Sequence, residues 1–329
     1  MGLVAAMPRY DTLPYMLRRT FTGAVFSGLG LTGLSAKPPA VKPGDIPTRE
    51  FGKTGVRVSV IGQGGARMAL LRTPEQCRAH LRYALSLGMN FFDCAHSYWE
   101  GHSEEVYGDV LPEVRKQVFL TTKTTRRTRK EAEAELHLSL KRLRTDYVDL
   151  WQIHGVQKKS DVERIFGPGG AMEAFESARK AGKCRFIGFT GHHDPGVHLA
   201  MLAACDSYDS IFMPLHAADH AYLSFEKAVL PEAVKRGMAI QAMKIFANSF
   251  LLRVLNAGEC LRYALSLPIH AAVVGCSTAG QLDDDARAAR GFHPMEAGEM
   301  EQLRVRAVTA GPGGLKGAPL EYWKRQRPL

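Results

Sequence analysis

The chain has 329 residues, 45% of them hydrophobic, and carries a net charge of +10 at pH 7. A chain of this length and composition can bury a large core, and one parallel barrel takes about 250 residues, so we expect a single catalytic domain. The densest stretch of positive charge, Lys123 to Lys130, has no interleaved aromatic residues, which argues against nucleic-acid binding. The six cysteines form no Cys-x-x-Cys pair, which argues against a zinc ribbon or an iron–sulfur site.

The first 36 residues resemble a twin-arginine signal peptide. Arg18 and Arg19 precede a mild apolar run from Thr22 to Leu34, which ends at the small residues Ser35-Ala36. The run is too short and too glycine-rich for a stable membrane span. We therefore expect export through the twin-arginine machinery to the periplasm or beyond, with a flexible arm on a cytoplasmic protein as the alternative. Residues 37–47 hold four prolines and read as a linker.

A dinucleotide-binding fingerprint of the form G-x-G-x-x-G also occurs in this region, at Gly28, Gly30 and Gly33. Such a fingerprint requires a preceding strand, a following helix and an acidic residue about 20 positions later. Here the glycines lie inside the expected signal, and a proline-rich linker follows. We therefore give the match little weight.

After the linker, short apolar runs alternate with helical patterns. This alternation is typical of parallel strands joined by helices and predicts a single-domain (β/α)8 TIM barrel over residues 48–310, followed by a basic, irregular tail over 311–329. The strands are expected at Val58–Ile61, Asn90–Phe92, Val118–Thr122, Val148–Ile153, Arg185–Phe189, Ser210–Leu215, Met238–Met243 and Ala271–Val274. The helices are expected at about Cys77–Leu87, Ser103–Val114, Lys130–Leu143, Ala171–Ala181, Val197–Ala204, Phe225–Arg236 and Leu251–Leu265, and the last helices run from about Gln281 to Val308.

Polar side chains follow three of these strands at the point where each strand ends. Asp93, Lys123 and His154 occupy these positions, and Tyr98 lies in the loop five residues after Asp93. The C-terminal ends of the strands of a barrel converge on one face, where the active site lies. A tyrosine beside a lysine and an aspartate, with a histidine nearby, is a proton-donating set. The pattern indicates chemistry on a carbonyl group.

These residues resemble the aldo-keto reductase family. The motifs that carry the resemblance are Asn90–Tyr98, Thr121–Thr124 and Tyr147–Gly155, and it extends from about Thr48 to Leu303. The segment from Phe51 to Ser59 is similar to the short hairpin with which many members begin. The resemblance implies an NADP- or NAD-dependent enzyme that reduces a small-molecule aldehyde or ketone, or oxidises the alcohol.

The resemblance also implies a role for each polar residue. Tyr98 would be the general acid, and Lys123 would stabilise its phenolate, because a neighbouring cation favours the charged form of a phenol. Asp93 would keep Lys123 charged and oriented, and His154 would hydrogen-bond the substrate oxygen. Members of this family bind the nicotinamide cofactor without a Rossmann domain, which agrees with the small weight given to the glycine fingerprint.

The cofactor positions depart from the common pattern of the family. Where many members have Ser-Asn after the fifth strand, this chain has Thr190 and Gly191, and His192 would substitute for the missing amide. After the seventh strand, Met243 would pack on the nicotinamide and Lys244 would meet the pyrophosphate as a point charge.

The cofactor positions after the eighth strand also depart from the common pattern of the family. NADP-preferring members often carry a lysine and an arginine where this chain has Gly275 and Gln281, which weakens the expectation of NADP over NAD. Donors remain at Cys276 and Ser277. The remaining candidate cofactor positions are Asp284 and Asp285 near the adenine, and Gly64 and Gly65 in the turn after the first strand.

Two other functions stay open. One alternative is a metal-dependent barrel hydrolase, because a loop and the following helix start contain His192, His193, Asp194 and His198. A zinc site needs three or four ligands in a defined geometry, and we expect no metal here. A regulatory barrel that binds a nicotinamide without turnover is the other alternative, and it has no need of the four polar residues. The loops that set the substrate carry no recognisable code.

Overall fold

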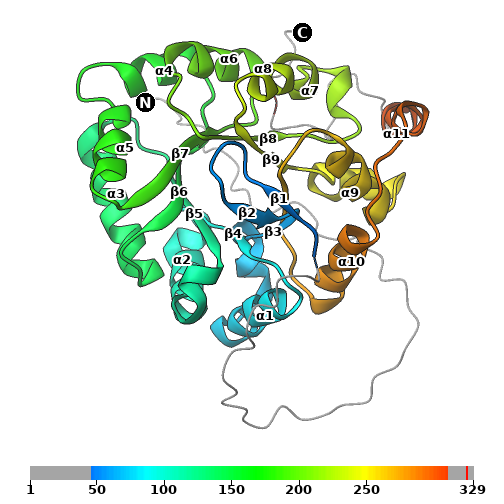
Figure 1. Cartoon of the computed structure of the whole chain (residues 1–329), viewed down its shortest axis with the longest axis horizontal. Helices are drawn as coiled ribbons and strands as arrows, with labels where there is room; N and C mark the ends of the chain where they lie inside the picture. The colour runs from blue at the N-terminus through cyan, green and yellow to red at the C-terminus, as the bar shows by residue number, and fades with distance from the viewer. Residues whose placement is uncertain (1–45, 310–323, 325–329) are drawn as a thin grey trace, which may run out of the picture.

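The structure, a computed structural model, describes residues 46–309 and Lys324. The expected signal segment, most of the linker and the tail other than Lys324 lie outside the described residues. Eight parallel strands close into a barrel, and helices surround it, as Figure 1 shows from one end. The expected (β/α)8 architecture is therefore confirmed.

The barrel strands follow one another around the barrel in chain order, with the last strand beside the first. They are β3 (Ile61–Gly64), β4 (Phe91–Asp93), β5 (Phe119–Thr124), β6 (Val148–Ile153), β7 (Cys184–Thr190), β8 (Ser210–Pro214), β9 (Ala239–Met243) and β10 (Ala271–Val274). Every neighbouring pair is parallel, so all C-terminal ends point to the same face. This common direction brings distant polar residues together.

A short antiparallel hairpin precedes the barrel. It consists of β1 (Thr48–Glu50) and β2 (Arg57–Ser59), with Thr48 opposite Ser59. The Phe51 ring packs against Phe119 at a centroid distance of 4.8 Å and against Phe91 at 5.6 Å, so the hairpin closes the N-terminal end of the barrel.

The expected first strand, Val58–Ile61, was placed wrongly. Its apolar run spans the end of β2 and the beginning of β3. Of the glycines expected in the turn, Gly65 begins η1 and Gly64 is the last residue of β3. Gly62 has to be a glycine there, because a Cβ would lie 2.5 Å from the Phe91 ring.

The helices cover the outside of the barrel. The α-helices are α1 (Pro74–Ser86), α2 (His102–Val110), α3 (Arg129–Leu143), α4 (Lys159–Phe166), α5 (Ala171–Lys180), α6 (Pro195–Ala204), α7 (Phe225–Ala228), α8 (Leu230–Lys235), α9 (Ala257–Ser266), α10 (Ala279–Arg290) and α11 (Ala297–Thr309). The short 3-10 segments are η1 (Gly65–Leu71), η2 (Tyr98–Gly101), η3 (Leu111–Gln117), η4 (Asp219–Ala221) and η5 (Ala247–Arg253).

Three expected helices are interrupted in the structure. The segment 225–236 breaks before Pro231, because proline has no N–H to donate inside a helix and is accommodated in the first turn of α8. The segment 251–265 is divided into η5 and α9, because the Asn256 side chain accepts from the Glu259 N–H and starts a new helix. The segment 103–114 likewise changes from α2 to η3 at Leu111.

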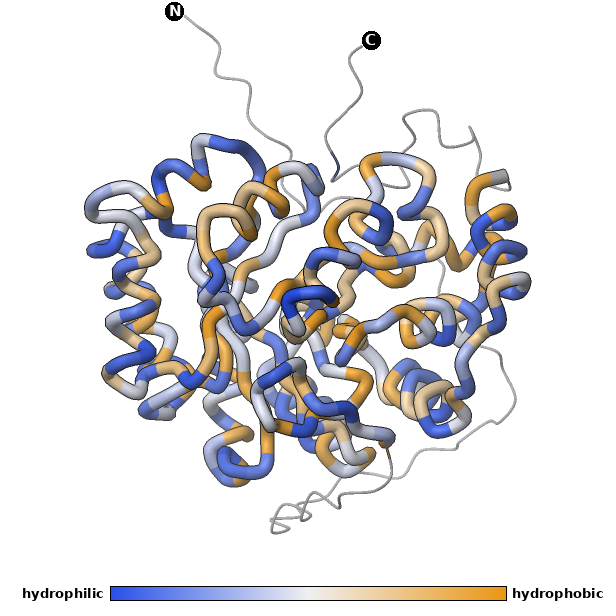
Figure 2. Tube along the Cα trace, turned by 45° about the horizontal axis from the view of Figure 1, so that its top comes forward, coloured by the Kyte–Doolittle hydropathy of each residue, from blue (hydrophilic) through white to orange (hydrophobic). Residues whose placement is uncertain are grey.

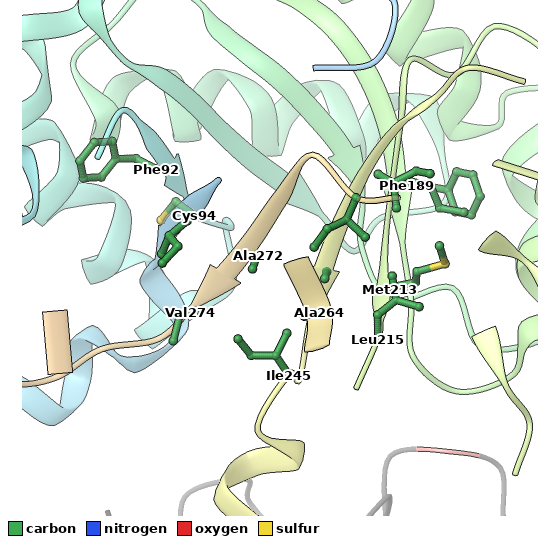
Figure 3. Packing of buried hydrophobic residues seen from close by; sticks show 14 of the residues in the cluster. Phe92, Cys94, Phe189, Met213, Leu215, Ile245, Ala264, Ala272 and Val274 are labelled. Atoms are coloured by element: carbon green, nitrogen blue, oxygen red, sulfur yellow. The ribbon is translucent and has the colours of Figure 1, made fainter. Parts of the chain in front are cut away.

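Two apolar layers hold the barrel together. The outer layer fills the space between strands and helices, where the Trp151 and Phe175 rings stack at 3.7 Å. Figure 2 shows hydrophilic and hydrophobic residues alternating along the outer helices, and Figure 3 shows side chains of the outer layer such as Phe189 and Met213. The inner layer includes Phe91, Phe119 and further inward-facing side chains near the bottom of the barrel. Within residues 46–309, none of the helices has the length and apolar character needed to cross a bilayer.

Candidate active site

The four polar residues singled out in the sequence meet at the C-terminal face. Asp93 is the last residue of β4, Lys123 lies near the end of β5, and His154 directly follows β6. Tyr98 begins η2, in the loop after β4. Their convergence follows from the parallel register, in which Gly64, Asp93 and Thr121 are aligned across β3, β4 and β5.

A buried ion pair lies at the centre of this face. The Lys123 Nζ is 2.6 Å from the Asp93 Oδ1, and neither side chain is more than 3% exposed. Lys123 also donates to the Cys94 carbonyl at 2.6 Å, and Thr121 donates to the same Asp93 oxygen at 2.7 Å. Burial is the largest single influence on the pKa of Lys123 and acts to lower it. The charge and hydrogen bond of Asp93, together with Tyr98, act in the opposite direction and outweigh burial, so the net shift is upward and the ammonium stays charged.

Tyr98 lies directly above this pair. Its Oη is 3.4 Å from the Lys123 Nζ, and the ammonium is 4.8 Å from the centre of the Tyr98 ring. Burial raises the pKa of Tyr98 to about 12, while the Lys123 charge acts in the opposite direction. The phenol is therefore protonated at neutral pH, and the nearest cation is placed to stabilise the phenolate left by proton transfer.

The imidazole of His154 packs against Tyr98. It meets the Tyr98 ring edge-on, with the centroids 5.5 Å apart. Burial and the charge of Lys123 hold the pKa of His154 well below its usual range, so the ring is neutral at pH 7. Arg127 donates to the carbonyls of His154 and Gly155 at 2.9 and 3.0 Å and fixes the start of this loop.

A pocket of about 150 Å³ opens beside Tyr98. It brings four of the expected cofactor residues to the catalytic groups: Gly64, Met243, Lys244 and Gly275. Lys244 has a left-handed backbone with φ of 57° and donates to the Asn248 side-chain oxygen at 3.1 Å. Burial, followed by the repulsion of Arg67, lowers the pKa of Lys244 to about 8.

The other expected cofactor residues do not line this pocket. At the β7 end, Gly191 is closed in, because a Cβ would lie 2.6 Å from the Val156 carbonyl oxygen and 2.7 Å from the His198 ring. Thr190 is buried and accepts from the Val156 N–H, and the half-buried His192 follows in the same loop. Gly65 is buried at the start of η1, where a Cβ would meet the Ser103 hydroxyl.

The residues after β10 stabilise the start of α10. The Cys276 thiol and the Asp285 carboxylate are buried and 2.9 Å apart. The Gln281 side chain accepts from the Ser277 N–H at 2.9 Å, and Asp284 forms an ion pair with Arg287. These contacts give each side chain a structural partner, and a role at the cofactor stays a prediction.

The pocket also contains residues that the sequence did not reveal, namely Arg67, Phe212, Asn248 and Ser249. Arg67 had one signal, its place three residues after the end of β3, but its presence in the same pocket as Lys244 depends on tertiary structure.

The histidines after β7 have structural surroundings. The Asp194 side chain accepts from the Gly196 N–H and caps α6, and the buried His198 packs between the rings of Phe189 and Phe225. Among the described residues, no group of three or more His, Cys, Asp or Glu side chains is placed to hold a metal ion.

Comparison with known proteins places this geometry in a family. A model described as "Aldo/keto reductase family" matches residues 60–257. The chain is 30% identical over 200 residues to "Aldo-keto reductase YhdN" of Bacillus subtilis, covering 55% of this chain and 56% of that protein. It is 32% identical over 162 residues to "Aldo-keto reductase yakc [NADP(+)]" of Schizosaccharomyces pombe, covering 44% and 45%.

The fold is also similar to solved structures. An aldo-keto reductase from Klebsiella pneumoniae in complex with NADPH superposes with a TM-score of 0.66 at 21% identity, covering 80% of this chain and 95% of that chain. In sequence, this chain spans about half the length of the curated relatives that it matches.

Proposed function

Because the chain belongs to the aldo/keto reductase family, we propose that it is a nicotinamide-dependent oxidoreductase that reduces an aldehyde or ketone to an alcohol, or catalyses the reverse reaction. The observation that carries this proposal is the contact of one buried lysine with both Asp93 and Tyr98 beside an open pocket. A regulatory barrel that only binds a nucleotide has no need of such an arrangement.

Each residue has a defined task in the reaction. Tyr98 Oη donates its proton to the carbonyl oxygen of the substrate as negative charge develops there. Lys123 stabilises the resulting phenolate at 3.4 Å, and Asp93 fixes the position of the ammonium. The neutral His154 ring is placed to orient the same oxygen by a hydrogen bond. A nicotinamide, when bound, supplies the hydride or accepts it.

The residues that line the pocket suit the nicotinamide and the phosphates of such a cofactor. Met243 offers an apolar surface beside the catalytic groups, and the cations of Lys244 and Arg67 suit phosphates. Gly64 has no side chain, and a Cβ at this position would lie only 3.3 Å from the Val273 side chain and from the Val274 carbonyl oxygen. The backbone of Gly64 therefore forms this part of the pocket wall. That a relative is named for NADP(+) and a structure of the same fold holds NADPH supports NADP(H) over NAD(H).

A substrate panel tests the proposal. The purified protein is mixed with NADPH or NADH and with aldehydes, ketones and sugars, and the loss of reduced nicotinamide absorbance is recorded. We expect turnover with at least one carbonyl compound. Tight binding of the dinucleotide without turnover of any compound would instead favour the regulatory barrel.

We further propose that residues 1–36 direct export by the twin-arginine route, followed by the linker 37–47, the catalytic barrel 48–310 and the tail 311–329. The motif Arg18-Arg19 and the weakly apolar run to Leu34 support this proposal. Cell fractionation tests it, with Arg18→Lys/Arg19→Lys as the variant. Exported wild-type protein with a new N-terminus near Lys37 and a cytoplasmic variant are expected. An intact Met1 and a purely cytoplasmic wild type would refute it.

A further inference from the structure

Arg67 and Gly275 lie next to each other in the lining of the pocket. Arg67 lies in η1 directly after β3, and Gly275 directly follows β10, the neighbouring strand in the barrel. A Cβ built on Gly275 would lie 2.7 Å from the Arg67 Cγ and 3.3 Å from its Cβ. The stem of Arg67 therefore occupies the space that any side chain at position 275 would need.

A second cation, Lys244, lines the same pocket. Lys244 follows β9, and the electrostatic repulsion between Lys244 and Arg67 shows that the two charges act on each other. Among the described residues that line the pocket, Asp93 is the sole carboxylate, and it is bonded to Lys123. Two cations that line one pocket provide a site for an anion.

We propose that Arg67 and Lys244 together bind the diphosphate of the nicotinamide dinucleotide, and that the missing side chain at Gly275 is what admits Arg67 to the site. The proposal rests on the oxidoreductase function proposed above. It assigns part of the phosphate contact to Arg67, a residue from the segment after the first barrel strand, in addition to Lys244.

The position of the pair selects the diphosphate over the 2′-phosphate. Arg67 and Lys244 line one small pocket together with Tyr98 and Asp93, so they lie near the reacting end of the cofactor. The diphosphate is the phosphate group nearest the nicotinamide in either dinucleotide. The guanidinium fork suits two phosphate oxygens at once, whereas the lysine acts as a point charge.

Binding to the free protein tests the proposal without any need for catalysis. Dissociation constants for NADPH and NADH are measured by quenching of protein fluorescence. Arg67→Ala should weaken both dinucleotides to a similar extent, by about 10- to 100-fold, as expected for the loss of charge-assisted hydrogen bonds. The matched control is Arg72→Ala, because Arg72 is an exposed arginine at the end of the same η1 segment and does not line the pocket.

The variant Gly275→Ala tests the role assigned to Gly275. Its Cβ should displace Arg67 and weaken both dinucleotides, while circular dichroism and the unfolding midpoint stay near those of the wild type. Arg67→Ala/Gly275→Ala should bind no more weakly than Arg67→Ala alone, because both changes remove the same contact. Additive losses in the double variant would overturn the assigned role of Gly275.

The outcomes separate this inference from the proposed function. A wild-type protein that binds neither dinucleotide would defeat the oxidoreductase proposal itself. Wild-type binding with unchanged affinity in Arg67→Ala would overturn only the role of Arg67. A loss confined to NADPH would overturn the assignment to the diphosphate, because it would place Arg67 at the 2′-phosphate.

Discussion

The affinity for the dinucleotide should fall as the pH rises through the range in which Lys244 loses its proton. Burial and the nearby Arg67 lower the pKa of Lys244 to about 8, well below the ordinary value of a lysine. The shift is downward, so the charge is present below pH 8 and is lost above it. A bound phosphate favours the charged form, and the pKa of Lys244 in the complex is therefore higher than in the free protein.

The size of the effect follows from this pKa. With a pKa of about 8, roughly 90% of the free protein carries the charge at pH 7 and roughly 10% at pH 9. If the charged form alone binds tightly, the dissociation constant rises about tenfold between these two values. Residual affinity of the neutral form would make the rise smaller.

Fluorescence titration with NADH across pH 6 to pH 10 measures this dependence, and NADH is chosen because it has no 2′-phosphate of its own to titrate. Lys244→Met is the control, and it should bind weakly with a dissociation constant that hardly changes between pH 7 and pH 9. A wild-type affinity that is flat across this interval, or a Lys244→Met variant that keeps the same pH dependence, would refute the role given to Lys244.

Two buried ion pairs lead to predictions about stability. Asp93→Asn leaves the buried Lys123 ammonium without its carboxylate. The free energy of unfolding, measured with urea, should fall by about 3–5 kcal/mol. A loss below about 1 kcal/mol would show that the pair contributes little. Lys324 and Asp219 form a fully buried pair at 2.7 Å, so Lys324→Met should destabilise the protein by a similar amount in the same assay. Lys180→Met, a change at an exposed lysine at the end of α5, serves as the control, and equal stability of the two variants would contradict the prediction.

Most of the barrel could be predicted from the sequence, because its strands are short apolar runs that end at polar residues. The run from Val148 to Ile153 has the same bounds in the structure, and His154 follows it as expected. The same property placed Asp93, Lys123 and Tyr98 on one face. Parallel strands that close a barrel leave no other arrangement for their C-terminal ends.

The errors have a different physical origin. The run Val58–Ile61 is continuous in hydrophobicity, and only tertiary pairing divides it between the hairpin and the barrel. The helix α4 was not predicted, because it is short and its start depends on the Asp161 carboxylate accepting from the Gln157 and Lys158 N–H groups. Short-range patterns do not contain such contacts.

The cofactor pocket was only partly predictable for the same reason. Cys276 and Asp285 were predicted to lie at the cofactor because of their positions in the family motif. In the structure, their side chains contact each other in the interior. Arg67 lies beside Gly275 although more than 200 residues separate them in the chain, and no sequence pattern indicated this contact.

The central claim, that Tyr98 donates a proton to a carbonyl substrate, is tested most directly by the rate of carbonyl reduction in Tyr98→Phe. Tyr208→Phe is the matched control, because the buried Tyr208 hydroxyl has no hydrogen-bond partner in the described part of the chain and does not line the pocket. With a carbonyl compound that the wild type reduces, the account predicts that Tyr98→Phe lowers kcat by about 100-fold or more while its dissociation constant for NADPH stays unchanged. A Tyr98→Phe variant that reduces the compound at nearly the wild-type rate would contradict it.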